Sequence, residues 1–175
     1  MSRFVCLFLA LLMAAPVAAQ QKMGFVDTQR VLDRLPEYAS VQQSLNQLAQ
    51  EYTTELDRIQ GELDELEAEF AARELLYTDE ERQRRQDEIR QKRQELNQRR
   101  RQYFGPEGEL FREEQQRLRP VQERVLTAIE TVALDEDYDY VVDRGGELLL
   151  LFAKPEHDLT DFVLVELGID TTGGR

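Results

Sequence analysis

The longest regular pattern in the sequence is a stripe of apolar residues that begins just after Glu37. From Glu37 to Phe104 there are 68 residues with no proline and a single glycine, Gly61. Apolar residues recur there in steps of three or four, which predicts a helix with one apolar face. The stripe consists of Val41, Leu45, Leu48, Tyr52, Leu56, Ile59, Leu63, Leu66 and Phe70. Its mean spacing of about 3.6 residues predicts a nearly straight helix.

The stripe is interrupted near residues 75–80, where we expect the chain to reverse. Thr78 followed by Glu81 is the signal of a capping box, so a new helix is expected to begin there. Between Ile89 and Tyr103 apolar residues recur only every seven positions, which predicts a thinner seam on the returning helix. The pattern therefore predicts a helical hairpin over residues 37–119, with its tip near 75–80 and arms about 60 Å long.

A break interrupts the returning helix at residues 105–108, which read Gly-Pro-Glu-Gly. Pro106 lacks a backbone donor and Gly105 has poor helix propensity. If paired positions have numbers that sum to about 156, this break lies opposite Tyr52 in the hairpin. Tyr52, Tyr103 and Phe104 are then expected to cluster with Gly105 and Pro106 as a hinge within the arm. A simple local kink at the proline is the alternative.

The two ends of the chain predict a small body made of residues 20–36 and 120–175. Strands are expected at 22–27, 138–143 and 147–152, and short helices at 28–35 and 159–167. By the same pairing rule Pro120 faces Pro36 where the arms leave the body. Such a body is too small to hold long arms on its own core, so we expect oligomerisation through the strands. The candidate oligomer residues are Phe25, Val26, Tyr140, Val141, Val142, Leu149 and Leu151.

Residues 1–19 have the pattern of a secretory signal peptide. Arg3 gives a positive start, residues 4–15 are apolar, and small residues precede an expected cleavage site after Ala19. A membrane anchor is the alternative, but the run of about 12 residues is shorter than the ~20 needed to span a bilayer. Cys6 would leave with the peptide, so the exported chain would have no disulfide and must be stabilised by packing or assembly.

The charge of the chain is acidic and unevenly distributed. The sequence has 35 acidic and 22 basic residues, a net charge of −13, which argues against a nucleic-acid partner. Residues 51–81 contain 12 acids and 2 bases, whereas residues 82–102 contain 9 bases and 3 acids. Folding at the tip lays these segments side by side, so their attraction is expected to select the register. A polyanion-binding strip along the arginines is the alternative.

Candidate chemistry for an enzyme is sparse. His157 is the only histidine and lies in an expected loop. Asp135, Asp137 and Asp139 resemble the start of a calcium loop, but the positions that require glycine and glutamate hold Tyr140 and Gly146. Phosphate-binding, zinc-binding and nucleophile motifs are missing from the sequence. We therefore expect no catalytic, metal or cofactor site.

The order of these segments resembles the Skp/OmpH family of periplasmic chaperones. The resemblance rests on residues 23–32, 104–111, 140–143 and 158–164, together with the charged hairpin and the signal peptide. It implies an α+β fold and a jellyfish-like homotrimer, in which a small β-rich trimerisation body carries three helical arms. Such a trimer would hold unfolded outer-membrane proteins in a cavity between its arms, without ATP.

In that setting Leu75, Leu76 and Tyr77 at the tip are candidate client contacts, and ordinary capping of the hairpin is the alternative. The acidic net charge argues against binding to an anionic membrane surface, unlike the basic family members. A structural or adaptor coiled-coil protein of the cell envelope is the other functional candidate. An adaptor would need a second apolar face on its arms, and the sequence between Ile89 and Tyr103 provides almost none.

Overall fold

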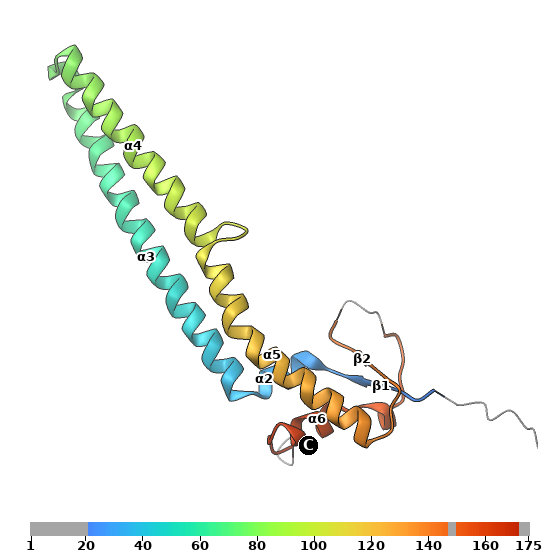
Figure 1. Ribbon diagram of the computed structural model, residues 1–175. Helices are drawn as coiled ribbons and strands as arrows, with labels where there is room; N and C mark the ends of the chain where they lie inside the picture. Colours follow the sequence, from blue (N-terminus) through green and yellow to red (C-terminus); the bar gives the residue numbers. More distant parts are fainter. Residues whose placement is uncertain (1–20, 147–149, 172–175) are drawn as a thin grey trace, which may run out of the picture.

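A computed structural model describes residues 21–146 and 150–171 of the chain, and shows a long arm rising from a small body (Figure 1). The elements in chain order are β1 (Met23–Val26), α2 (Thr28–Arg34), α3 (Pro36–Arg73), η1 (Glu74–Leu76), α4 (Asp79–Phe104), α5 (Glu109–Asp135), β2 (Tyr140–Asp143), η2 (Pro155–His157) and α6 (Thr160–Glu166). The expected signal peptide at residues 1–19 lies outside the described residues. So do residues 147–149 of the third expected strand.

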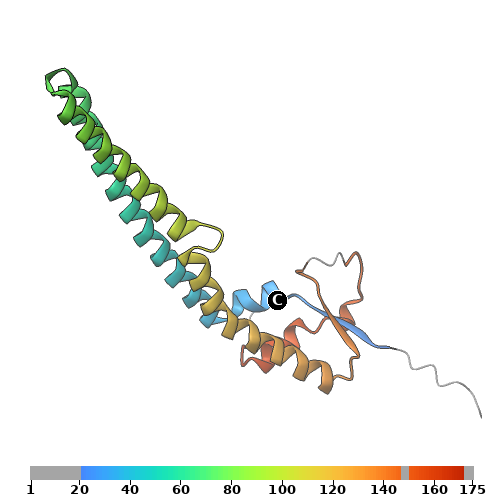
Figure 2. The same ribbon diagram turned by 45° about the horizontal axis from the view of Figure 1, so that its top comes forward.

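The outward helix of the arm is α3, and α4 with the first part of α5 returns beside it (Figures 1 and 2). Helix α3 spans 38 residues and begins with Pro36 in its first turn, where a missing N–H costs little. The predicted apolar stripe is confirmed, because the buried residues of α3 are all members of it. At Thr78 the side chain accepts the Glu81 N–H while the Glu81 carboxylate accepts the Thr78 N–H, which confirms the predicted capping box.

The returning helix is broken where the sequence predicts. Helix α4 ends at Phe104 and α5 begins at Glu109, and the loop between them projects from the side of the arm (Figure 2). Helix α5 then runs for 27 residues through Pro120 into the body. A single helix therefore runs from the arm into the body, with Pro120 inside it.

The body consists of β1, α2, the second part of α5, β2 and α6. Strands β1 and β2 are parallel, with Met23 opposite Tyr140 and Val26 opposite Asp143. The fully buried Thr160 joins the two ends of the chain, because its Oγ1 accepts the Asp27 N–H at 3.0 Å. The buried core contains Val26, Val31, Leu35, Val121, Val125, Ala128, Val132, Leu159, Val163, Leu164 and Leu167.

The body is less β-rich than the sequence pattern suggests. The described part of the third expected strand, residues 150–152, is not a strand, and the described residues form one two-stranded sheet. Leu151 and Phe152 are 86% and 81% exposed. A strand that is apolar on both faces needs cover on both, and the described residues place no layer over Leu151 and Phe152. The described chain is thus mostly helical, with long helices and a small strand pair.

Candidate functional site

The arm has a small apolar core of its own, apart from that of the body. Ile59, Leu63 and Leu96 are at most 4% exposed, and Leu56 and Tyr103 are each 9% exposed. Only Leu96 and Tyr103 are buried residues of α4, as the seven-residue spacing predicts. The returning helix therefore buries little apolar area per turn, and its hold on α3 depends on few side chains.

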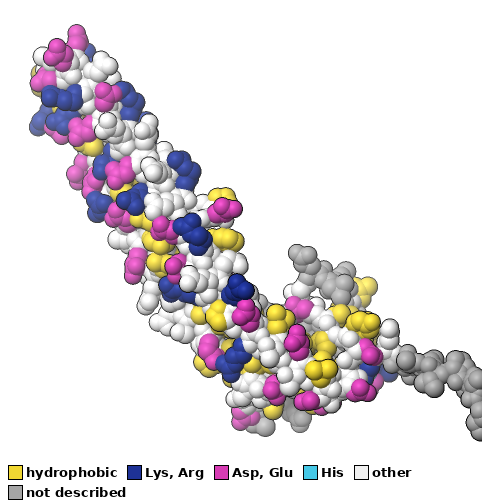
Figure 3. Space-filling model, viewed as in Figure 1, with side chains coloured by type: hydrophobic (Ala, Val, Ile, Leu, Met, Phe, Trp, Pro, Cys, Tyr) yellow, Lys and Arg dark blue, Asp and Glu magenta, His cyan; other side chains and the backbone are white. Residues whose placement is uncertain are grey.

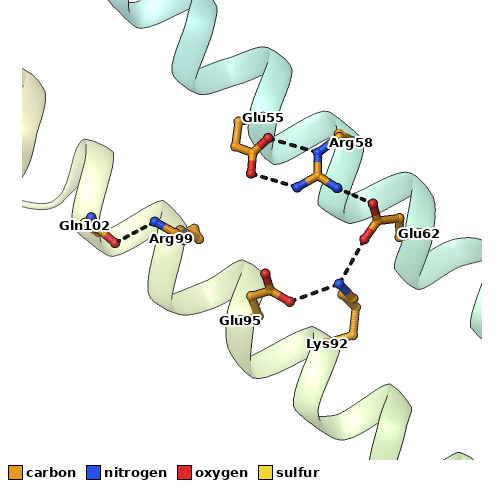
Figure 4. Close-up of polar contacts among 7 residues, drawn as sticks. All are labelled: Glu55, Arg58, Glu62, Lys92, Glu95, Arg99 and Gln102. Atoms are coloured by element: carbon orange, nitrogen blue, oxygen red, sulfur yellow. Dashed lines mark hydrogen bonds and ion pairs between the residues drawn. The ribbon is translucent and has the colours of Figure 1, made fainter.

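A network of ion pairs connects α3 and α4 along the same part of the arm (Figure 4). Lys92 Nζ lies 2.9 Å from Glu62 Oε2 on the opposite helix and 3.0 Å from Glu95 on its own. Glu62 also pairs with Arg58, which binds Glu55 in turn. The hydrogen bond from Lys92 lowers the pKa of Glu62, and the same contact raises the pKa of Lys92.

Most other charged contacts of the outer arm stay within one helix. Arg93 reaches across to Glu67, whereas Arg73, Arg82, Arg85 and Arg90 pair with acids three or four residues away. Such exposed pairs contribute about 0.2–1 kcal/mol each. Charge therefore connects α3 and α4 at two direct pairs, Lys92–Glu62 and Arg93–Glu67, among the described residues.

An aromatic cluster of Tyr52, Tyr103 and Phe104 lies beside the break between α4 and α5. The Tyr52 and Tyr103 rings are parallel with centroids 4.1 Å apart, and Phe104 meets Tyr52 edge-on at 6.2 Å. The structure thus brings together the three aromatic residues that the pairing rule placed near each other.

Glu109, the first residue of α5, ties the aromatic cluster to both sides of the break. The Tyr52 hydroxyl donates to Glu109 Oε2 at 3.1 Å, and Gln102 Nε2 donates to Glu109 Oε1 at 2.7 Å. The Gln102 contact, with help from Tyr52, lowers the pKa of Glu109. Burial, with the Glu109 contact added, raises the pKa of Tyr52.

Close backbone packing within the 105–108 loop requires its glycines. A Cβ on Gly108 would lie 2.6 Å from the Tyr103 carbonyl oxygen and 2.8 Å from the Gly105 nitrogen. The Gly108 N–H donates to the Gly105 carbonyl at 2.8 Å and the Gly105 N–H to Arg101 at 2.9 Å. The loop is therefore a tightly hydrogen-bonded turn.

The loop changes the register of the arm. At the aromatic cluster the pairing agrees with the rule, but nearer the body Glu37 pairs with Arg124. The rule would place residue 119 opposite Glu37. The residue found there is Arg124, so the returning chain lags behind the rule by 124 − 119 = 5 positions. The expectation that Pro120 faces Pro36 is wrong. Residues 105–108 fold into a turn that projects from the arm, so they do not advance the returning chain along α3.

At the tip of the arm two leucines are exposed to solvent and one tyrosine packs against the arm. Leu75 and Leu76 are 95% and 79% exposed. Tyr77 turns inward, with its ring 6.1 Å from that of Phe70 and its hydroxyl buried. Of the three candidate client contacts, Leu75 and Leu76 are thus on the surface, whereas Tyr77 closes the end of the seam.

The candidate oligomer residues divide into covered and accessible groups. Phe25 and Val26 are 4% and 1% exposed, so their own chain already covers them. Tyr140 and Leu151 lie on the surface, Val141 and Val142 are partly buried, and Leu149 lies outside the described residues. Strand β1 is flanked on one edge by β2 and on the other by Leu159, whose N–H donates to the Phe25 carbonyl at 2.9 Å.

His157, the single histidine of the sequence, contacts two neighbouring side chains of the body. His157 Nδ1 lies 3.3 Å from the Tyr138 hydroxyl and Nε2 lies 3.7 Å from Glu156. Among residues 21–146 and 150–171, acids, histidines and cysteines do not gather into a group that could hold a metal ion. No helix in those ranges has the length and hydropathy needed to cross a membrane.

The family model described as outer membrane protein (OmpH-like) matches residues 22–167. The chain belongs to the OmpH-like family. A solved structure from Caulobacter crescentus, described as a candidate outer membrane chaperone (OmpH-like), is similar to this OmpH-like chain with a TM-score of 0.70 and 19% identity. The match covers 85% of each chain and shows that the two share a fold. A comparison with curated proteins finds no match.

Sequence reasoning missed several residues of this OmpH-like protein. Glu109 had no local signal, because its partner Tyr52 is 57 positions away. Leu134, Phe162 and Val165 are 80%, 51% and 61% exposed. A helical projection of α6 contains the signal for Phe162 and Val165, since both lie opposite the face that holds Val163 and Leu164.

Proposed function

We propose that this OmpH-like chain is an ATP-independent holdase of the periplasm that binds unfolded outer-membrane proteins and prevents their aggregation. The observation that carries the proposal is the pair of exposed leucines, Leu75 and Leu76, at the end of an arm that extends away from the body. A holdase needs weak, adaptable apolar contacts at a distance from its own core. Membership of the OmpH-like family supports a chaperone role in general.

The proposed active form is a homotrimer in which three arms surround the client. Support comes from apolar side chains that one chain leaves uncovered on its body, which favour assembly. They are Met23, Leu134, Tyr140, Leu151 and Phe152. In the described residues β2 pairs with β1 alone, so its other edge is available to a second copy.

The arm is proposed to adjust to clients of different size by bending at the aromatic cluster. Gly105 and Pro106 interrupt the helix there, while Tyr52, Tyr103 and Phe104 supply a contact that can slide. Residues 37–119 would act as the arm, and residues 20–36 and 120–175 as the body. Removal of residues 1–19 during export would place the protein in the periplasm.

The surface of α4 supports a holdase over an adaptor coiled coil. An adaptor would present a second apolar seam to a partner helix. The exposed positions of α4 include Arg84, Arg93, Arg100 and Arg101, and its buried residues face α3. Stable docking of another helix along this side would require those charges to be desolvated.

The test is to dilute a urea-unfolded outer-membrane barrel protein into buffer containing the purified mature chain. Light scattering should fall to near the background at about one trimer per client, with or without ATP. Light scattering coupled to gel filtration should give the mass of three chains. An inert protein added at the same mass is the control. A monomeric chain that reduces scattering no more than this control would contradict the proposal.

A further inference from the structure

A groove on the body lies between the C-terminal end of α5 and the outward face of α6. Its cavity volume is about 460 Å³, within the usual range for binding clefts. Val132, Phe162 and Val165 supply apolar surface, and Asp135, Glu136 and Glu166 supply acids. The groove is separate from the arm and from its candidate client contacts.

The outward face of α6 is unusual for a surface helix. Val163 and Leu164 are at most 1% exposed and anchor α6 in the body. On the opposite face Phe162 and Val165 are 51% and 61% exposed, although the core does not need them. A surface helix ordinarily carries polar residues there. These two apolar side chains are therefore available to a partner.

The negative charge around the groove is only partly compensated by the chain itself. Four acids line the groove, Asp135, Glu136, Asp161 and Glu166, and the last turn of α5 has no basic residue. Acids at a helix C-terminus are disfavoured by the helix dipole, so a cation is favoured there. On the face of the body seen in Figure 3, acidic and hydrophobic side chains are interspersed.

Two basic side chains of the chain itself reach this region. Arg30 pairs with Asp161 at 2.8 Å, and Lys22 donates to the backbone carbonyl of Glu136. Asp135 and Glu166 are exposed acids at the groove. Together with the carbonyls at the end of α5, they form a negative rim around an apolar floor.

We propose that this groove docks a peptide segment of another protein in which lysine or arginine flanks a large apolar side chain. The apolar side chain lies between Phe162 and Val165, and the flanking cations contact Asp135, Glu136 and Glu166. An acidic partner is repelled by the same rim, and a polar cationic one leaves Phe162 and Val165 exposed. The site is distinct from client capture by the arms.

The first test measures fluorescence anisotropy of labelled peptides with the purified mature chain. A peptide of alternating lysine and leucine is compared with one of glutamate and leucine and one of lysine and serine. The lysine–leucine peptide should bind most tightly, and its affinity should fall as ionic strength rises. Equal binding of all three peptides would overturn the proposal.

Two exposed substitutions locate the site. F162S should weaken binding of the lysine–leucine peptide about tenfold, and E166K should weaken it while improving binding of the glutamate–leucine peptide. E65K, a charge reversal at an exposed position on α3, is the matched control and should bind as wild type. Wild-type affinity in both groove variants, or an altered assembly mass in F162S that marks a subunit interface, would overturn the proposal.

Discussion

The ring of Tyr52 on α3 lies flat against the ring of Tyr103 on α4, with centroids 4.1 Å apart and an angle of 1° between their planes. This stack lies immediately before the break that separates α4 from α5. In the described outer arm, the other contacts between α3 and α4 are a few aliphatic side chains, Ile59 among them, and two ion pairs. The stack is therefore the natural place to test how the arm is held.

Loss of the Tyr52 ring should loosen the outer arm. Y52L removes an aromatic pair worth about 0.5–1.5 kcal/mol and a hydroxyl hydrogen bond worth about 0.5–1.5 kcal/mol. Y52F retains the ring and loses only the contact with Glu109, so it should have the smaller effect. Hydrogen–deuterium exchange should speed up in residues 90–104 while the body stays protected. Equal exchange in Y52L and the wild type would show that the stack is not needed.

Addition of a methyl group to Gly108 should destabilise the protein, because the new Cβ would lie 2.6 Å from the Tyr103 carbonyl oxygen. We expect G108A to lower the free energy of unfolding in urea by about 1–3 kcal/mol. G61A is the matched control, since apart from its own helix backbone and chain neighbours nothing lies within 4 Å of its Cβ position. In the middle of α3 it should raise stability by about 0.5–1 kcal/mol. The opposite order would contradict the close packing of the loop.

Polar substitution of the tip should weaken client protection without affecting the fold. Leu75 and Leu76 are almost fully exposed, so L75S/L76S removes apolar contact area that the chain itself does not use. About two- to tenfold more protein should be needed for half-suppression of scattering. L126S, which changes an exposed leucine of α5 outside the proposed assembly residues, is the matched comparison. Undiminished protection by the tip variant, with the thermal midpoint unchanged, would remove the tip from the client site.

Acid should loosen the arm before it unfolds the apolar core of the body. The pKa of Glu81 is lowered by the Thr78 backbone hydrogen bond and that of Glu109 by Gln102, both from a usual value of 4.5. A carboxyl whose pKa is lowered by folding adds stability above its unfolded value, and that stability is lost as the pH falls through the folded value. Exchange in residues 78–104 should therefore accelerate below about pH 4.5.

Lys92 in the seam should make the stability of the arm fall at high pH. The hydrogen bond to Glu62 raises the pKa of Lys92 above its usual 10.5. The stability that this contact adds is therefore present below pH 10.5 and is lost as the pH rises through the raised pKa. E109Q tests the part of Glu109 in the acid effect. It should reduce the acceleration of exchange at low pH and leave the loss of stability at high pH unchanged. The same acceleration at low pH in E109Q and the wild type would show that this carboxyl does not take part.

The local elements of the fold could be predicted from the sequence because their causes are local. The period of the stripe in α3, the capping box at Thr78 and the break at 105–108 each depend on residues within a turn or two of one another. The stop after α6 is of the same kind, since Gly168 adopts a φ of +81°. The resemblance to the OmpH-like family rested on the order of these elements, and the family match confirms it.

The tertiary structure alone decided the register near the body, the state of residues 150–152 and the surfaces available for binding. The lag of the returning chain depends on how tightly the 105–108 loop folds upon itself, which backbone contacts set. Whether Tyr77 faces client or seam depends on Phe70, and whether Phe162 is covered depends on α5. A side chain's exposure is a property of what packs beside it, and those neighbours come from distant parts of the chain.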